Sequence, residues 1–325
     1  MCLVKLIERK KSSKFNSIEN VFDTLIPFLN INEILELPFL SKGVFNRIKN
    51  IAFLRRHNAQ LIHISGHDHY LLWYPFPKAI LTIHDIEALK RKKGIKRWLF
   101  QKLWFDWPIR NAKVVTTISE FSKKEIQSIS NYKTPIQVIH NPLTLPLTYV
   151  PKSFDKVKPR ILHIGTKENK NLSRLIQSLK GTSCKIVVVG QETESLKSQM
   201  EACGLDYTFK QNLSKDSMMT EYQLADILAF VSTYEGFGLP ILEAQAVGRV
   251  VLTSNVSSMP EVAGKGALSV DPFSVEAIRK GVEKLIKEDS LREILIQNGL
   301  ENIKRFDTES IAGKYNDLYS SVLAT

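Results

Sequence analysis

Two glutamates are the residues of this chain whose spacing most directly suggests chemistry. Glu235 and Glu243 stand on either side of a glycine-rich turn, within S-T-Y-E-G-F-G-L-P-I-L-E-A-Q-A-V-G of residues 232–248. Gly236 and Gly238 allow backbone angles that other residues avoid, so the chain can bend sharply there and approach a ligand closely. Two carboxylates beside such a turn are suited to accepting hydrogen bonds from sugar hydroxyls.

The residues around this turn predict the elements that hold the two glutamates. The apolar run of residues 226–231 has the length of a strand, Pro240 suits a helix start, and Gly248 is a typical helix stop. We therefore expect a strand, a turn and a helix, with Glu243 in the first helical turn. In a parallel sheet such a turn lies where ligands bind, and the helix start favours phosphate. A purely structural role remains open, because the helix dipole alone favours a glutamate there.

A second polar turn precedes another predicted helix. Gly165 is followed by T-K-E-N-K-N, so Lys167 and Lys170 flank the turn that opens the helix of residues 172–180. The turn matches neither G-x-G-x-x-G nor G-x-x-x-x-G-K-[ST], which weakens a nicotinamide-dinucleotide or P-loop interpretation. The two ammonium groups could hold a diphosphate by point charge, or they could be lysines of a solvated turn.

The order of the predicted elements indicates two α/β domains. The 325 residues are enough for two domains of about 150 residues each. Strands predicted at 2–7, 61–64, 79–83 and 114–117, with a helix near 17–29, precede a proline-rich linker at 141–159. A second alternation of strands and helices follows through residue 287, which favours a parallel sheet in each domain.

Basic residues are concentrated in the first half of the chain. Residues 1–155 carry 24 Lys and Arg against 12 Asp and Glu, and residues 156–325 carry 21 of each, so the net charge of +12 lies in the first half. Residues 90–107 interleave basic residues with Trp98, Trp104 and Trp107. This mixture suits an interfacial membrane helix or stacking on single-stranded nucleic acid; a third interpretation is that the aromatics belong to the core.

Other features favour a cytoplasmic protein that is at most peripheral on the inner face of the membrane. The three cysteines show neither paired nor metal-ligand spacing, and the N-terminal residues are too charged for a signal peptide. No apolar run approaches the roughly 20 residues that span a bilayer.

Histidines follow two predicted strands of the first half. His84 and Asp85 come directly after strand 79–83, so both should lie at the ligand-binding edge of the sheet. The run H-I-S-G-H-D-H of residues 63–69 invites a metal-site hypothesis, but its spacing fits no specific ligand set. A ligand-lining loop is the preferred interpretation, with His67 toward the ligand.

Several segments together resemble glycosyltransferase family 4, whose donor site carries an E-x7-E motif. The resemblance is carried by Y-Q-L-A-D at 222–226, E-G-F-G-L-P-I-L-E at 235–243 and S-S-M-P-E at 257–261, and it continues through residues 117–122, 138–142, 161–165 and 305–306. It implies a GT-B fold of two Rossmann-like domains facing across a central cleft. Residues 1–152 would bind the acceptor, with a C-terminal helix of about 306–325 packed back on them, and residues 157–305 would bind a nucleotide-sugar donor.

The resemblance also implies roles for single residues. Glu243 would hold the ribose hydroxyls, Glu235 would contact the transferred sugar, and Lys170 would neutralise the diphosphate leaving group in the transition state. The expected catalytic residues are Glu235, His84 and Lys170; the expected donor-binding residues are Gly165, Lys167, Lys170, Gln211, Leu213, Glu235, Phe237, Gly238, Leu239 and Glu243; and His67 and Asp85 are expected on the acceptor side.

The implied activity is transfer, with retention of configuration, of a sugar from a nucleotide-diphosphate sugar to an acceptor hydroxyl. The acceptor would be a surface polysaccharide or a lipid-linked glycan, and the basic half could contact an anionic membrane. No metal, cofactor or nucleic acid is expected, and the sequence contains no D-x-D triplet. The alternatives are a nucleotide-sugar epimerase on the same fold and a non-catalytic protein that binds a nucleotide-sugar or nucleic acid.

Two departures from the family pattern affect these expectations. Glu168 and Asn169 stand near the place where the family commonly has an arginine, so the diphosphate would depend more on Lys170. The first domain has R-K-K-S-S-K at residues 9–14 where many relatives have a glycine-rich loop, which weakens the acceptor-side assignments.

Overall fold

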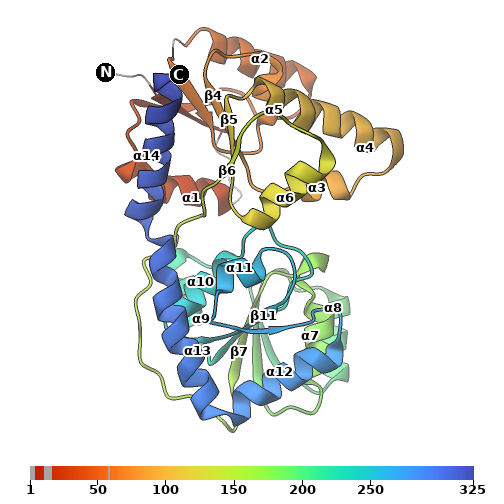
Figure 1. Ribbon diagram of the computed structural model, residues 1–325. Coiled ribbons are helices and arrows are strands. Elements are labelled where there is room, and N and C mark those ends of the chain that lie inside the picture. Colours follow the sequence, from red (N-terminus) through yellow and green to blue (C-terminus); the bar gives the residue numbers. More distant parts are fainter. Residues whose placement is uncertain (1–3, 11–16, 58) are drawn as a thin grey trace. The chain divides into compact units, whose positions relative to one another are not determined.

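A computed structural model describes residues 4–10, 17–57 and 59–325, and it divides the chain into two compact units (Figure 1). Unit 1 comprises residues 1–142 and 307–325, and unit 2 comprises residues 143–306. Residues 143–152, expected in the first domain, therefore belong to unit 2. The physical reason is that this segment bonds to unit 2, since Leu143 donates to the Phe306 carbonyl at 3.1 Å and Val150 donates to that of Val247 at 3.4 Å.

Unit 1 alternates strands and helices along most of its length. Its elements are β1 (Val4–Glu8), α1 (Ser17–Leu25), η1 (Ile26–Phe28), β2 (Glu33–Glu36), α2 (Val44–Arg55), β3 (Leu61–Ile64), η2 (His69–Trp73), β4 (Ala79–Ile83), α3 (Glu87–Lys90), α4 (Gly94–Gln101), the π-helical η3 (Lys102–Asp106), α5 (Trp107–Asn111), β5 (Val114–Thr117), α6 (Glu120–Ile129), β6 (Ile136–Val138) and α14 (Thr308–Ala324). Cys2 and residues 11–14 of the basic N-terminal loop lie outside the described residues.

The unit 1 sheet is parallel, in the order β2-β1-β3-β4-β5-β6. Its order reverses at β1 and β3, so the loops after these strands diverge and leave a crevice where ligands bind in such sheets. Strands β1, β3 and β4 are buried along their whole length, as expected of a parallel sheet covered on both faces.

Helix α14 returns to unit 1 at the end of the chain and packs beside α1 (Figure 1). The Tyr319 hydroxyl is 2.7 Å from Nδ1 of His63, a buried side chain of β3. Asn316 donates to the carbonyl of Phe28 at 2.9 Å, and the ammonium of Lys78 donates to that of Leu323 at 2.7 Å. These bonds tie the C-terminal helix to the sheet and to η1.

Unit 2 has the same kind of alternation. Its elements are β7 (Arg160–Ile164), η4 (Glu168–Lys170), α7 (Leu172–Leu179), β8 (Lys185–Val189), α8 (Glu194–Ala202), β9 (Asp206–Lys210), α9 (Lys215–Leu224), β10 (Ile227–Phe230), α10 (Leu239–Ala246), β11 (Val250–Ser254), α11 (Met259–Ala263), β12 (Leu268–Val270), α12 (Val275–Lys287), α13 (Asp289–Asn302) and η5 (Ile303–Phe306).

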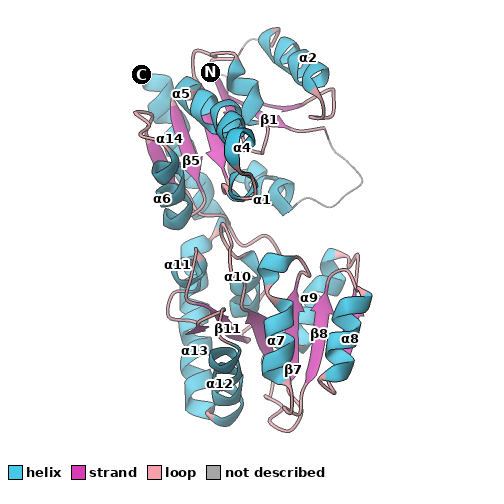
Figure 2. Ribbon diagram, turned by 90° about the vertical axis from the view of Figure 1, so that its right-hand side faces the viewer, coloured by secondary structure: helices cyan, strands magenta, loops and turns pink. Residues whose placement is uncertain are grey.

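The unit 2 sheet is also parallel, in the order β12-β11-β10-β7-β8-β9, with helices on both faces (Figure 2). This is the Rossmann order, and its switch point lies between β7 and β10. Helix α7 shows why these helices dock, because Leu172, Leu175, Ile176 and Leu179 recur at helical spacing and are all buried. The expected α/β class with two Rossmann-like units is confirmed.

Most helices and strands begin and end where the sequence patterns predicted. The exceptions are explained by residues at or near each boundary. The helix expected near residues 17–29 ends at Leu25, and Pro27 lies in the 3-10 turn η1 that follows. Strands β2 and β6 were not predicted, because each is a short edge strand that lacks a buried apolar run.

Candidate functional site

The switch point of the unit 2 sheet brings together the two polar turns found in the sequence. One turn follows β7 and contains Gly165, Lys167 and Lys170; the other follows β10 and contains Glu235. Because β7 and β10 are hydrogen-bonded neighbours, the turns after them emerge side by side. Residues 65 positions apart in the chain can therefore act at one place.

Lys170 and Glu235 form an ion pair in this place. The Lys170 ammonium lies 2.7 Å from Oε1 of Glu235, and both side chains are largely covered. The same ammonium lies 4.9 Å from the centre of the Phe230 ring. Gly165, at φ +94°, leaves room for the Lys170 side chain to pass close to its Cα. A Cβ at this position would approach the Lys170 Cγ to 2.8 Å.

Two asparagines join the turns and hold their backbones. Asn169 donates from its side chain to the Tyr234 carbonyl at 3.0 Å, and its own carbonyl accepts from the Thr233 amide at 2.8 Å. Asn171, which is buried at φ 63°, donates to the carbonyls of Val231 and Pro272 at 2.9 and 2.7 Å. The sequence interpretation gave neither asparagine this role, and the N-cap position of Asn171 before α7 was the available signal.

The start of α10 has the geometry expected of a helix that faces a ligand. Gly238, at φ +122°, precedes the helix, and Phe237 is buried. The Ser258 hydroxyl donates to the carbonyls of Glu235 and Phe237 at 2.9 and 2.6 Å, which fixes the turn. The first backbone N–H groups of a helix lack intrahelical partners, so those near Leu239 are suited to phosphate or sugar oxygens.

Glu243 lies just past the first turn of α10 rather than within it. The helix begins at Leu239 and has no acidic residue in its first turn, so the prediction of a first-turn glutamate was wrong. The carboxylate is buried, accepts the Tyr222 hydroxyl at Oε2, and accepts the Thr144 hydroxyl at Oε1 at 3.2 Å. Burial raises the pKa of Glu243, and both hydrogen bonds oppose that rise. The roles of Tyr222 and Thr144 were missed, although Tyr222 belongs to the quoted Y-Q-L-A-D segment.

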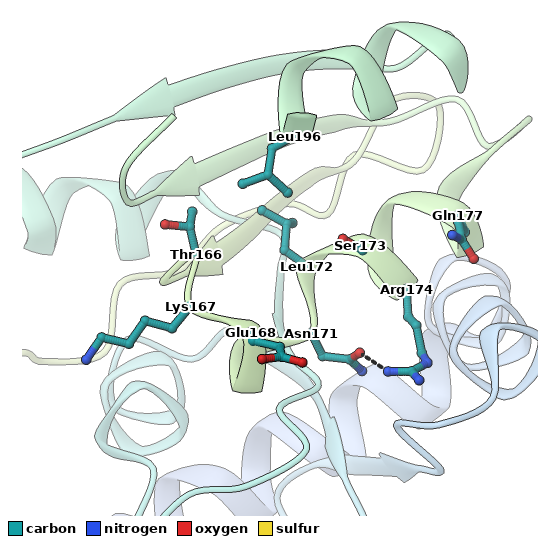
Figure 3. Close-up of a pocket in the computed structure, with 9 residues that line it drawn as sticks. All are labelled: Thr166, Lys167, Glu168, Asn171, Leu172, Ser173, Arg174, Gln177 and Leu196. Carbon is teal, nitrogen blue, oxygen red and sulfur yellow. Dashed lines mark hydrogen bonds between the residues drawn. The ribbon is translucent and has the colours of Figure 1, made fainter. Parts of the chain in front are cut away.

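The remaining predicted donor residues are Gln211, Leu213 and Lys167, and the Lys167 carbonyl accepts the Lys170 amide at 2.9 Å. Gln211 is exposed and Leu213 half-buried on the loop between β9 and α9. Lys167 is exposed and, with Arg174 and Leu196, is among the residues that line an open pocket of about 440 Å³ beside α7 and α8 (Figure 3). The lining of this pocket includes neither Lys170 nor Glu235.

In unit 1, His84 follows β4 as predicted and is buried. Its Nε2–H donates to the Ser65 carbonyl at 2.8 Å, and burial lowers its pKa to about 4. The ring is therefore neutral near pH 7, with Nδ1 as the acceptor. Asp85 was expected to orient either His84 or the acceptor. The Ser65 carbonyl holds the ring at Nε2, and the Asp85 carboxylate accepts the Glu87 amide at 2.8 Å.

His67 lies on the segment between β3 and η2, with its ring 5.9 Å from that of His84. The two other histidines of the metal-site hypothesis, His63 and His69, have different hydrogen-bond partners. His63 bonds to Tyr319 and to Thr82 inside the core, and His69 donates to the Trp104 carbonyl at 2.8 Å. Within residues 4–10, 17–57 and 59–325, no group of three or more His, Cys, Asp or Glu side chains could hold a metal ion.

No helix in the described part of the chain has both the length and the apolar character needed to cross a bilayer.

Two family models match the chain, and together they extend over both units. The model for glycosyl transferases group 1 matches residues 151–302, and the model for glycosyltransferase family 4 matches residues 21–145. The first match contains both turns of the unit 2 site, and the second contains His67 and His84.

Named relatives are glycosyltransferases. An O-antigen chain mannosyltransferase B of Escherichia coli is 29% identical over 268 residues, which cover 74% of this chain and 70% of the relative. The serotype-specific mannosyltransferase WbdA of Escherichia coli is 31% identical over 125 residues, but the chain spans only 15% of that relative's length. These relatives support glycosyl transfer rather than the epimerase alternative.

The fold also matches a solved structure over nearly its whole length. Anabaena Alr3699/HepE in complex with UDP and glucose has a TM-score of 0.82 at 17% identity, with 98% of this chain and 100% of that chain covered. From these matches and the two parallel sheets, we conclude that the chain is a GT-B glycosyltransferase, with residues 151–302 similar to the glycosyl transferases group 1 and residues 21–145 similar to glycosyltransferase family 4.

Proposed function

We propose that this glycosyltransferase moves a sugar from a nucleotide-diphosphate sugar to an acceptor hydroxyl with retention of configuration, in the synthesis of a surface polysaccharide. The observation that carries the proposal is the ion pair of Lys170 and Glu235 beside the start of α10. A cation, a carboxylate and the N-terminus of α10 at one switch point match the diphosphate, hydroxyl and phosphate groups of such a donor.

Each residue of the site then has a distinct task. Lys170 leaves Glu235 for the diphosphate, where it balances the charge that develops as the bond from the sugar to phosphate breaks. Glu235 is freed to accept hydroxyls of the transferred sugar. Glu243 holds the ribose hydroxyls, and the backbone N–H groups of Phe237, Gly238 and Leu239 bind phosphate or sugar oxygens. The acceptor oxygen forms the new bond to the sugar as the bond from the sugar to phosphate breaks, and its proton passes to an oxygen of the leaving diphosphate.

The donor and acceptor classes follow from the relatives and from unit 1. Because the long-matching relative is named a mannosyltransferase, a mannosyl nucleotide is the first donor to test. Neutral His84, with exposed His67 beside it, offers acceptor nitrogens for sugar hydroxyls in unit 1. We propose a glycan acceptor carried on a lipid, which the enzyme meets from the cytoplasm at the inner face of the membrane, and a reaction that uses no metal or cofactor.

A thermal-shift panel tests the donor site. GDP-mannose and UDP-, dTDP- and ADP-sugars are added to the native protein and to Glu243→Gln, with NAD and a short oligonucleotide as controls. A ligand at 100 times its Kd stabilises a fold by about 2.7 kcal/mol. We expect one sugar-nucleotide class to stabilise the native protein, the Gln variant to lose this response, and Glu283→Gln, at a partly exposed glutamate of α12, to keep it.

The alternatives give other patterns in the same panel. Stabilisation by the oligonucleotide but by no sugar-nucleotide would support a nucleic-acid-binding protein and contradict the donor site. Equal stabilisation of the native protein and Glu243→Gln would mean that the donor binds elsewhere. Donor binding without transfer to any glycan would support the non-catalytic alternative.

A further inference from the structure

The open pocket beside α7 and α8 of unit 2 has no part in the proposed reaction. Its volume of about 440 Å³ lies within the range of about 300–1,000 Å³ that is typical of small-molecule sites. The lining residues belong to the turn after β7, to α7 and, through Leu196, to α8 (Figure 3). A cavity of this size can hold a ligand of its own.

The strand order places this pocket on the opposite face of the sheet from Glu243. The chain runs from β7 through α7, β8 and α8 to β9 in one direction across the sheet, and from β10 through α10, β11 and α11 to β12 in the other. Crossover connections between parallel strands are right-handed, so connections that run in opposite directions put their helices on opposite faces. A ligand beside α7 and α8 therefore lies across the sheet from the place proposed for the ribose.

The pocket lining offers hydrogen-bond donors and acceptors together. Lys167 and Arg174 supply donors, and Glu168 supplies a carboxylate acceptor. Ser173 and Gln177 can both donate and accept. Within the described part of the chain, the side chains of Lys167, Ser173 and Gln177 have no hydrogen bond or ion pair, so they are available to a ligand. This mixture suits sugar hydroxyls, because each hydroxyl both donates and accepts.

Arg174 is held in place before any ligand binds. Its Nη1 donates to Oδ1 of Asn171 at 2.8 Å, and Asn171 is itself buried and bonded to two backbone carbonyls. The rigid guanidinium has five N–H donors, so donors remain for a ligand at little cost in side-chain ordering. Leu172 and Leu196 add apolar surface to the lining, against which the C–H face of a sugar ring can pack.

We propose that this pocket binds a neutral stretch of a saccharide chain, apart from the place where the sugar is transferred. A phosphate group is a poorer ligand, because the Glu168 carboxylate in the same lining would repel it. The inference rests on the proposed function, since an enzyme of polysaccharide synthesis meets a chain of several sugars. A chain that stays bound in the pocket between transfers has a raised effective concentration for the next one.

Titration of the full chain with neutral trisaccharides tests the inference. Mannotriose and maltotriose are the probes, inorganic phosphate is the anionic comparison, and ligand-observed NMR gives the Kd. We expect at least one trisaccharide to bind the native protein and phosphate not to compete with it. Ser173→Tyr adds a bulky ring to the lining and Gln177→Ala removes an amide, both at exposed positions of α7. Each should weaken trisaccharide binding about fivefold or more.

Gln297→Ala is the matched control, because Gln297 is an exposed amide on α13, outside the pocket lining. It should bind the trisaccharide as the native protein does. Absence of trisaccharide binding, competition by phosphate, or an equal loss in Gln297→Ala would overturn the proposal. Binding that is lost in His67→Gln and kept in both pocket variants would place the saccharide in unit 1 instead.

The donor panel separates this inference from the proposed function. Ser173→Tyr and Gln177→Ala should keep the native stabilisation by the sugar-nucleotide, because neither residue belongs to the proposed donor site. Intact donor binding without trisaccharide binding would overturn the pocket inference alone. A native protein that no sugar-nucleotide stabilises would contradict the proposed function itself.

Discussion

The two glutamates of the E-x7-E motif have different environments, and this difference supports different tasks. Glu235 is half-buried and its charge is balanced by Lys170. Glu243 is buried and is held by two neutral hydroxyls, and burial raises its pKa. A carboxylate with a cation beside it is suited to a region where charge changes during the reaction. A carboxylate held by hydroxyls is suited to fixed hydrogen bonds with a ligand.

Tyr222 is a positioning residue for Glu243, and Tyr222→Phe tests it. The change removes one of the two bonds that oppose the effect of burial, so the pKa of Glu243 should rise further and the protonated form should persist to higher pH. Protonated Glu243 has one oxygen that donates and is a weaker acceptor of ribose hydroxyls than the carboxylate. We expect the KM for the donor to rise about tenfold, the equivalent of about 1.4 kcal/mol, with kcat nearly unchanged and a larger KM effect at lower pH.

Tyr207→Phe provides the comparison, because the Tyr207 hydroxyl also bonds a glutamate, Glu201, but on the surface at 3.3 Å. This variant should keep the native KM. A Tyr222→Phe enzyme with an unchanged KM, or with kcat lowered as much as KM is raised, would show that Tyr222 does not act by holding Glu243 for the donor.

Among the elements, the turn after β7 needs a glycine at position 165, because the Lys170 side chain packs directly against it. In Gly165→Ala the residue would keep a positive φ that L side chains rarely adopt, and its Cβ would press on Lys170. We expect a loss of about 1–3 kcal/mol in the free energy of unfolding, measured by urea denaturation. Turnover should fall as well, because the ammonium is displaced from the place where charge develops.

Gly313→Ala is the matched substitution in a helix. Gly313 lies within α14, and a Cβ added there meets no heavy atom within 4 Å. Alanine should stabilise this helix by about 0.5–1 kcal/mol and leave turnover unchanged. If Gly165→Ala were as stable and active as the native protein, the close approach of Lys170 to this turn would not matter for the site.

Element by element, the sequence predicts what is encoded locally. The strand, glycine turn and helix around Glu235 follow from an apolar run, glycines and a proline, all within one short segment. The hydrogen-bond partners of Glu243 cannot be predicted from its local sequence, because Tyr222 is 21 residues away and Thr144 is 99 residues away. Likewise His63 and His69 look like one cluster in the sequence, but one belongs to a strand and the other to the turn after it, so they face different neighbours.

For the whole molecule, the distribution of charged and buried polar groups differs between the two units. The sequence alone locates the excess of basic residues in the first half, because the net charge of each half follows from its numbers of Lys, Arg, Asp and Glu. It does not indicate that three histidines of unit 1, His63, His69 and His84, are buried. Burial lowers the pKa of His63 and His69 to about 3 and that of His84 to about 4. In unit 2, burial lowers the pKa of one histidine, His163, to about 4.

These histidines predict that unit 1 is the more acid-sensitive unit. Below the unfolded pKa of about 6.5, the unfolded chain binds protons that the folded chain excludes, so stability falls as pH falls. Between pH 7.5 and 5.5 each histidine lowers the free energy of unfolding by about 1.4 kcal/mol, or by about 4 kcal/mol for the three in unit 1.

All four tryptophans lie in unit 1, so tryptophan fluorescence follows the unfolding of this unit while circular dichroism follows that of both. At pH 5.5 the fluorescence midpoint should fall below that of circular dichroism. His63→Gln should reduce the pH dependence, and His57→Gln, at a partly exposed position, should not. Midpoints that shift equally by both methods would contradict the difference between the units.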